Sequence, residues 1–336
     1  GSPAIDAGTN AGCPATDQRG ATRPADGNHD ATSACDIGAY ETEVPIQVIP
    51  GPNGGNGPGG VGITDGSSTL ELWLKGDAGA FANTSCTIAV TSGHDVACWQ
   101  DQSGNNRTMT QPRSGQLPTY NAHAVNGQPA LHFTEREMDY LQNNTNVALG
   151  AGDDTFTYFA TWFPNVTNQA VIFEQNTTAK LPGRRAALLQ INNYYGFNGE
   201  SNDAHIVPYT PGTWILTSLL LNGAATNNVH IYHYGTPYTG TIDMNVQNVG
   251  TDQMLVGKKS NDSPLEYFDG DIPEIIVFSN TLSDTERILV ENYLSAKYGL
   301  SLSANDLYAG DDALNGDFDL DVAGIGQYGG TQHTQA

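Results

Sequence analysis

Short stretches in which apolar and polar residues alternate recur along the middle of the chain, and this alternation constrains the fold more than any other feature. In Asp154–Phe163, residues Phe156, Tyr158, Ala160 and Trp162 share one face of a predicted strand, and mostly Thr occupies the other face. Such a pattern is typical of an antiparallel strand with one buried face. Turns rich in Gly, Asn and Pro separate further predicted strands at Leu70–Leu74, Ala170–Phe173, Ala187–Ile191, Trp214–Leu221, Val229–Tyr234, Met254–Val256 and Ile272–Phe278. Many short strands at close spacing predict an all-β, two-sheet jelly-roll sandwich.

One segment predicts a helix near the end of this region. Ser283 followed by Glu286 forms a capping-box pattern, in which the Ser hydroxyl and the Glu carboxylate satisfy free amides of the first turn. An apolar stripe at helical spacing follows, and Gly299 is a natural C-terminal stop. We therefore expect a helix over 284–298 that packs on the sandwich.

Composition divides the 336 residues into four predicted parts. Residues 1–44 are poor in apolar side chains and cannot form a core alone. Residues 45–66 are rich in Pro, Gly and Asn, which indicates a linker. Residues 67–303 hold the main domain. Residues 304–336 form an acidic tail or the start of a further β module.

Two of these parts resemble known families. The stretches SPAIDAG, DQRGATRP and CDIGAYE in residues 1–44 are similar to the closing rungs of bacterial right-handed parallel β-helix surface proteins, although the preceding rungs are missing. The main domain resembles the bacterial laminin-G-like branch of the concanavalin-A-like superfamily. This second resemblance is carried by LELWLKGDAG at 70–79, WQDQSGNNRTMTQ at 99–111 and the run from GDIPEIIVF to KYGL at 270–300. It implies a two-sheet jelly roll, a fold that hosts lectins, hydrolases and adhesive spacers alike.

The charge of the chain limits its partners. Thirteen Lys and Arg stand against 36 Asp and Glu, a formal net charge of −23. Nucleic acids and anionic membranes both bind through basic residues, so neither is an expected partner. No apolar run approaches the roughly 20 residues of a membrane-spanning helix, so we expect no membrane insertion. No signal peptide is present, so any export signal would lie upstream.

Four cysteines fall into two local pairs, Cys13 with Cys35 and Cys86 with Cys98. Four cysteines allow three pairings, and local pairing is the simplest of these. Neither pair has the Cys-x-x-Cys spacing of a zinc site. Disulfides would favour an extracellular or cell-surface location, and four unpaired buried thiols are the alternative.

Calcium is the predicted cofactor. Asp26, Asn28 and Asp30 alternate as oxygen ligands do in a calcium loop, and Asp36 could add a further carboxylate. A solvated acidic turn is the alternative. The same spacing recurs in the acidic tail, where a loop would let the carboxylates converge and a regular strand would not, at Asp317, Asp319 and Asp321.

A glycan site is predicted in the segment Asn192–Asn198, which combines aromatic rings with amides. The candidate residues are Tyr194, Tyr195, Phe197 and Asn198. Rings that stack on a sugar and amides that bind its hydroxyls would suit this role. Packing in a turn and in the core is the alternative.

Motifs for catalysis are weak. Glycoside hydrolysis needs two carboxylates flanking the bond. The compact hydrolase signature is Glu-x-Asp followed closely by a second Glu. Glu137-x-Asp139 begins this pattern, but Leu141 or Gln142 stands where the second Glu is needed. His230 and His233 would point to opposite faces of a strand. No nucleophile or phosphate-binding motif is present. We therefore expect the chain not to be an enzyme.

Two functions follow from these observations. The first is an extracellular structural or adhesive module, a filament subunit that exchanges strands through its tails with copies of itself or with neighbouring β domains. The second is a carbohydrate-binding, lectin-like module of a large bacterial surface adhesin, with glycans as partners. Glycoside hydrolysis is a remote third.

Overall fold

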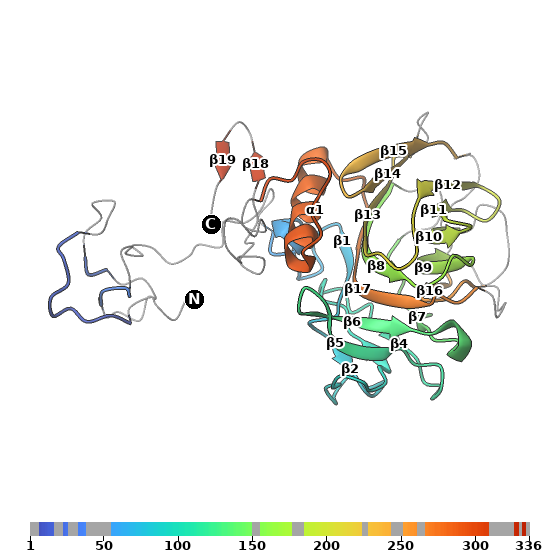
Figure 1. Cartoon of the computed structure of the whole chain (residues 1–336), viewed down its shortest axis with the longest axis horizontal. Helices are drawn as coiled ribbons and strands as arrows, with labels where there is room; N and C mark the ends of the chain where they lie inside the picture. The colour runs from blue at the N-terminus through green and yellow to red at the C-terminus, as the bar shows by residue number, and fades with distance from the viewer. Residues whose placement is uncertain are drawn as a thin grey trace. The chain divides into compact units, whose positions relative to one another are not determined.

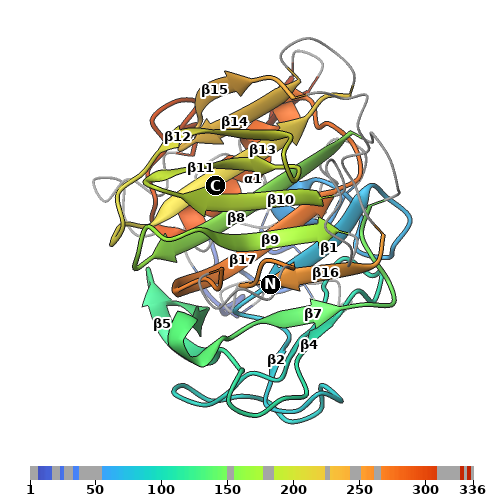
Figure 2. The same ribbon diagram turned by 90° about the vertical axis from the view of Figure 1, so that its right-hand side faces the viewer.

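A computed structural model (Figure 1) describes residues 7–16, 23–25, 33–37, 55–149, 155–176, 185–223, 228–242, 251–260, 266–308, 326–328 and 331–333. The chain divides into two compact units, Gly1–Ile49 and Pro50–Ala336. The larger unit is built from two antiparallel sheets that face each other, as Figure 2 shows. The prediction of an all-β, two-sheet sandwich with one α-helix is confirmed for the described residues.

The first sheet has eight strands. Seven follow one path through the sheet: β15 (Thr236–Gly240), β14 (Val229–His233), β13 (Ile215–Leu221), β8 (Phe156–Pro164), β17 (Gly270–Phe278), β6 (Gln128–Phe133) and β5 (Thr119–Val125). The eighth, β1 (Leu70–Lys75), pairs with the second half of β17. Strand β17, which comes late in the chain, therefore lies beside strands β1 and β6, which come early.

The second sheet has nine strands, several of them only two residues long. Their order is β12 (Asp203–Pro208), β11 (Tyr194–Asn198), β10 (Arg185–Ile191), β9 (Ala170–Asn176), β16 (Gln253–Val256), β7 (Leu141–Asn143), β4 (Met109–Thr110), β3 (Cys98–Trp99) and β2 (Ala80–Phe81). Its longer strands, β9 to β12, face the viewer in Figure 2.

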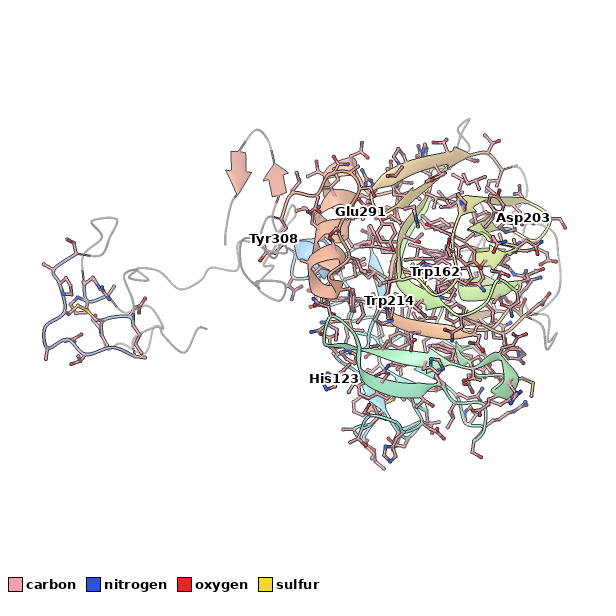
Figure 3. All side chains as sticks on the ribbon, in the orientation of Figure 1. His123, Trp162, Asp203, Trp214, Glu291 and Tyr308 are labelled. Carbon is pink, nitrogen blue, oxygen red and sulfur yellow. A yellow bond between two sulfur atoms is a disulfide. The ribbon has the colours of Figure 1, made fainter. Side chains whose placement is uncertain are left out.

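The main hydrophobic core lies between the two sheets. Phe156, Tyr158, Ala160 and Trp162 of β8 all enter it, as their alternation predicts; Trp162 is labelled between the layers in Figure 3. The opposite face of β8 is not solvated, however, because Phe159 packs into a second cluster under the helix. A strand predicted to be half-buried is thus buried on both faces.

The helix α1 (Asp284–Tyr298) covers the outer face of the eight-stranded sheet. Its capping box is present, with Ser283 accepting from the Glu286 amide and the Glu286 side chain accepting from the Ser283 amide. Gly299 ends the helix in the left-handed conformation, as predicted. Leu289, Val290, Leu294 and Tyr298 pack from the helix against apolar residues of β1, β8, β13 and β17.

Part of the segment predicted as a linker packs on this helix. The short 3₁₀ turn η1 (Pro58–Gly60) lies against α1. Gly59 has φ 62°, and a Cβ there would come within 2.6 Å of the Leu289 carbonyl oxygen. Only glycine fits this close approach, so residues 55–60 belong to the larger unit.

The two tails are described only in part. In the smaller unit, the Asn10 side chain bonds the backbone of Ser33 and Cys35, and an antiparallel bridge joins Ala25 to Ala34. Near the C-terminus, β18 (Gly326–Tyr328) pairs with β19 (Thr331–His333). Residues 309–325 lie outside the described residues, so strand exchange through the tails stays a prediction.

Candidate functional site

The predicted calcium ligands fall largely outside the described residues. Asp36 is described and buried, and its backbone carbonyl accepts from the Arg23 guanidinium at 2.7 Å. Within the described ranges, no group of three or more His, Cys, Asp or Glu side chains could hold a metal ion. Calcium stays a prediction for the residues beyond these ranges, namely Asp26, Asn28, Asp30, Asp317, Asp319 and Asp321.

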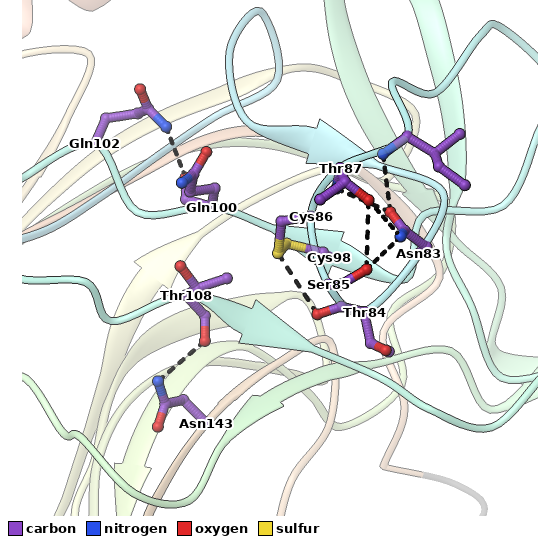
Figure 4. Close-up of a disulfide and its surroundings, with 11 residues drawn as sticks. Asn83, Thr84, Ser85, Cys86, Thr87, Cys98, Gln100, Gln102, Thr108 and Asn143 are labelled. Atoms are coloured by element: carbon purple, nitrogen blue, oxygen red, sulfur yellow. Dashed lines mark hydrogen bonds between the residues drawn. A yellow bond between two sulfur atoms is a disulfide. The ribbon is translucent and has the colours of Figure 1, made fainter.

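Both predicted disulfides are present, Cys13–Cys35 and Cys86–Cys98. Figure 4 shows that the second one joins strand β3 to a polar loop, in which the Asn83 side chain accepts from the amides of Thr87 and Ile88. Paired cysteines are typical of proteins in oxidising, extracellular surroundings. No helix in the described part of the chain has the length and apolarity needed to cross a bilayer.

The predicted glycan residues divide between the two faces of one strand. Tyr195 and Phe197 are fully buried in the core between the sheets, where the Tyr195 hydroxyl lies 2.9 Å from His233 Nδ1. Their placement corrects the expectation that these two rings stack on a sugar, because a ligand cannot reach them. Tyr194, by contrast, is 48% exposed, and Asn198 faces outward with the groups described next.

A row of side chains crosses the outer face of the nine-stranded sheet. Strand pairing aligns Leu255, Glu174, Ala187, Asn198 and Asp203 on β16, β9, β10, β11 and β12 respectively. Paired residues point to the same face, and Ala187 belongs to a small apolar cluster distinct from the main core. The row therefore lies on the face away from the eight-stranded sheet.

Glu174 is the fully buried carboxylate of this row. Its Oε1 accepts from the Ser260 amide at 2.8 Å and from the Asn176 side chain. Its Oε2 lies 2.9 Å from Arg185 Nε. This second contact is an ion pair without hydrogen-bond geometry, so among the described residues neither Oε2 nor Nε makes a hydrogen bond.

The Arg185 guanidinium joins the row to the surface. Its Nη2 donates to Ser260 Oγ at 2.6 Å, and its Nη1 donates to Asn198 Oδ1 at 3.1 Å and to Glu200. Arg185 is buried, whereas the Glu200 side chain is 22% exposed. We call Glu174, Asn176, Arg185, Asn198, Glu200 and Ser260 the outer polar cluster.

Electrostatics couple the outer polar cluster to its neighbours. Burial raises the pKa of the Glu174 carboxyl to about 7, even though Arg185, Ser260 and Lys259 act to lower it. Burial also lowers the pKa of His205, which follows Asp203 on β12, against the opposing charge of Asp203. His205 is only partly buried and Asp203 is exposed, so together with Tyr194 and Glu200 they form a rim that solvent reaches.

This arrangement can bind polar ligands and can move a proton. A carboxylate, amides and a guanidinium held in place by one another are pre-organised to bind hydroxyls. A carboxyl with a pKa near 7 can act as an acid or a base at neutral pH. Sequence reasoning missed Glu174 and Arg185, although a Glu inside the apolar run AVIFEQN is a signal of a paired buried charge.

No family profile and no curated protein matches the chain. Among solved structures, a GH54 α-L-arabinofuranosidase soaked with a cyclic sulfate inhibitor aligns at TM-score 0.50 and 14% identity, over 69% of this chain and 60% of that one. The Trypanosoma rangeli sialidase aligns at TM-score 0.40 and 12% identity (72% and 35% of the chains), and the binding domain of botulinum neurotoxin serotype G at 0.45 and 12% (68% and 51%). The first of these likenesses shows a shared β-sandwich fold.

The expectation that the chain is not an enzyme is contradicted, because a glycoside hydrolase, the GH54 α-L-arabinofuranosidase, shares its fold. The prediction considered only acids that lie close together in the sequence, as Glu137 and Asp139 do. Folding instead brings Glu174 and Glu200, from different parts of the chain, onto one guanidinium. Spacing along the sequence does not reveal such a pair.

Proposed function

We propose that the chain is a carbohydrate-recognition module of an extracellular, cell-surface protein, and that the outer polar cluster with its rim is the ligand site. One observation carries the proposal. Glu174 Oε2 and Arg185 Nε are buried yet lack a hydrogen bond among the described residues. The two atoms lie 2.9 Å apart as an ion pair, and the same guanidinium pairs with the partly exposed Glu200, so the buried carboxylate is connected to a surface that a polar ligand can reach.

Sugar chemistry suits this site. Each sugar hydroxyl both donates and accepts, and the rim offers carboxylate acceptors on Glu200 and Asp203 and an imidazole on His205. Tyr194 adds an exposed ring at the rim. The resemblance to laminin-G-like and concanavalin-A-like domains, and the fold shared with an arabinofuranosidase, agree with a glycan as the ligand. The two disulfides support the extracellular location.

Glycoside hydrolysis is the second candidate, favoured by the pKa of Glu174 near 7. A general acid for this chemistry needs such a raised pKa, and Glu200 would be the second carboxylate. Glu174 is fully buried, whereas an acid must touch the glycosidic oxygen, so binding is the first candidate. Release of reducing ends from a bound polysaccharide, abolished in Glu174→Gln and Glu200→Gln, would establish hydrolysis.

A glycan array with the whole chain tests the binding proposal. The best ligand is then titrated against Glu200→Gln and His205→Ala, with Glu137→Gln and His123→Ala as matched controls on exposed residues away from the rim. Each rim variant should weaken binding about tenfold, since a hydrogen bond involving a charged group contributes ~1.5–3 kcal/mol. Equal affinities for rim and control variants would contradict the proposal, as would the absence of any glycan ligand.

A further inference from the structure

A lysine and an aspartate lie in contact beneath the end of helix α1. Lys297 Nζ, in the last turn of α1, is 2.9 Å from Asp77 Oδ1, in the loop that follows β1. The same Nζ is 2.8 Å from Oε2 of Glu274, a fully buried residue on β17. Two carboxylates therefore hold one amine, and the two partners Asp77 and Lys297 are 220 residues apart in the chain.

Aromatic side chains surround two of these three groups, Glu274 and Lys297. Trp73 Nε1 donates to Glu274 Oε1 at 2.5 Å, and the hydroxyls of Tyr293 and Tyr298 donate to the two oxygens at 3.1 and 2.7 Å. The Lys297 side chain is only 9% exposed. Glu274 is thus fixed in position, and it holds Nζ against the Asp77 carboxyl, whose side chain is 32% exposed.

We propose that Lys297 Nζ and Asp77 Cγ become joined by an intramolecular isopeptide bond, with Glu274 carrying the proton. The Lys297 ammonium and the Asp77 carboxylate condense to an amide and one water, so atoms and charge balance without any co-reactant. The N–Cγ bond forms, and one Cγ–O bond breaks. Enforced contact of this kind can raise the rate of a bimolecular reaction by orders of magnitude.

Proton transfer is the step that Glu274 provides. Burial lowers the pKa of Lys297, but Glu274 and Asp77 together outweigh burial and leave that pKa raised. The amine is therefore charged in the ion pair, and Nζ becomes nucleophilic only when its proton passes to Glu274. Glu274 then returns this proton, and passes on the second proton that Nζ loses as the amide forms, to the oxygen that leaves Cγ as water. Lys75 Nζ, 3.6 Å from Asp77 Oδ2, is placed to stabilise the negative oxygen that develops there.

The consequence would be a covalent clamp on the sandwich. The bond would tie the last turn of α1 to the end of β1, across the outer face of the eight-stranded sheet. It would close a loop of 220 residues that contains every strand of the two sheets except β1. The inference is independent of the proposed glycan site, which lies on the other sheet.

Intact mass spectrometry of the whole chain, with disulfides reduced and the protein denatured, tests the proposal. We expect the mass of the sequence less one water. After trypsin digestion, a branched peptide should join Asp77 to Lys297, and cleavage after Lys297 should be lost because its Nζ is acylated. A full mass overturns the proposal. So does a loss of water located elsewhere, such as a succinimide within one peptide.

Variants test which side chains take part in forming the bond. Lys297→Arg and Asp77→Ala should keep the full mass, and Glu274→Gln should keep it in protein shown by circular dichroism to be folded. Asp77→Asn should lose one ammonia in place of one water, an outcome that a merely structural ion pair cannot give. Lys259→Arg is the matched control, because Lys259 pairs with Glu266 at 3.0 Å and takes no part in the contact between Asp77 and Lys297. That variant should still lose one water.

Discussion

The two outer faces of the sandwich use buried carboxylates in different ways. On the eight-stranded sheet, helix α1 closes the face, and Glu274 receives donors from Trp73, Tyr293, Tyr298 and Lys297. On the nine-stranded sheet, Glu174 shares one guanidinium with a partly exposed Glu200, and among the described residues its Oε2 makes an ion pair with Arg185 but no hydrogen bond. A carboxylate whose two oxygens both accept hydrogen bonds stabilises the fold. A carboxylate with an oxygen that accepts none, and that connects to solvent, is available to a ligand.

A second carboxylate under the helix follows the first pattern. Glu291, labelled on α1 in Figure 3, accepts from Ser218 Oγ at 2.7 Å and pairs with Arg287. Asp203, labelled on the opposite side of the sandwich, is exposed. Burial alone does not separate the two faces, since Glu174 and Glu274 are both fully buried. The two faces differ in what covers them: helix α1 lies over Glu274, and no helix of the described residues lies over Glu174.

The largest effect should come from Glu274→Ala. Removing this carboxylate leaves three aromatic donors without their acceptor and leaves Lys297 with Asp77 alone, and breaking a buried ion pair costs about 3–5 kcal/mol. Urea denaturation should therefore show a loss of this size in the free energy of unfolding. Glu137→Ala, on an exposed loop, is the control and should change stability little. A loss below about 1 kcal/mol for Glu274→Ala would show that the contacts of Glu274 do not hold helix α1 on its sheet.

Glu174 should instead make stability depend on pH. Its pKa rises from 4.5 to about 7 on folding, so the folded state holds this proton more tightly. The stabilisation from that proton is complete below pH 4.5 and is lost as pH rises through 7. Relative to Glu174→Gln, the wild-type protein should lose about 3 kcal/mol of unfolding free energy across this window. A difference that does not change with pH would show that Glu174 stays ionised throughout.

Ser283→Ala tests how strongly α1 is held on its sheet. The change removes the Oγ that accepts from the Glu286 amide, and loss of such a cap costs about 1 kcal/mol. Thermal or chemical unfolding followed by circular dichroism measures the loss. An unchanged stability would indicate that tertiary contacts of the helix already compensate for the missing cap.

The smallest effect on stability should come from the rim. His205→Ala should change the free energy of unfolding by less than about 0.5 kcal/mol, as is usual for surface positions, while it weakens glycan binding. A large loss of stability in this variant would show that His205 stabilises the fold and does not belong to the ligand site.

Local patterns predicted much of the architecture. The capping box at Ser283, the stop at Gly299 and the inward face of β8 all depend on neighbours a few residues apart, and all are present. The outer polar cluster could not be predicted this way, because Ser260 is 75 residues from Arg185. Strand order alone brings such residues together. The buried rings of Tyr195 and Phe197 failed as candidates because alternation on a strand sends every second residue to the core.

Hydrogen–deuterium exchange with and without a saturating glycan tests the central claim most directly. The account predicts ligand-dependent protection in β11 and β12, around Asn198, Glu200 and His205, and unchanged exchange in α1 and β5. Protection confined to the helix-covered face, or to the loops around the Cys86–Cys98 disulfide, would contradict the assignment of the ligand site to the nine-stranded sheet.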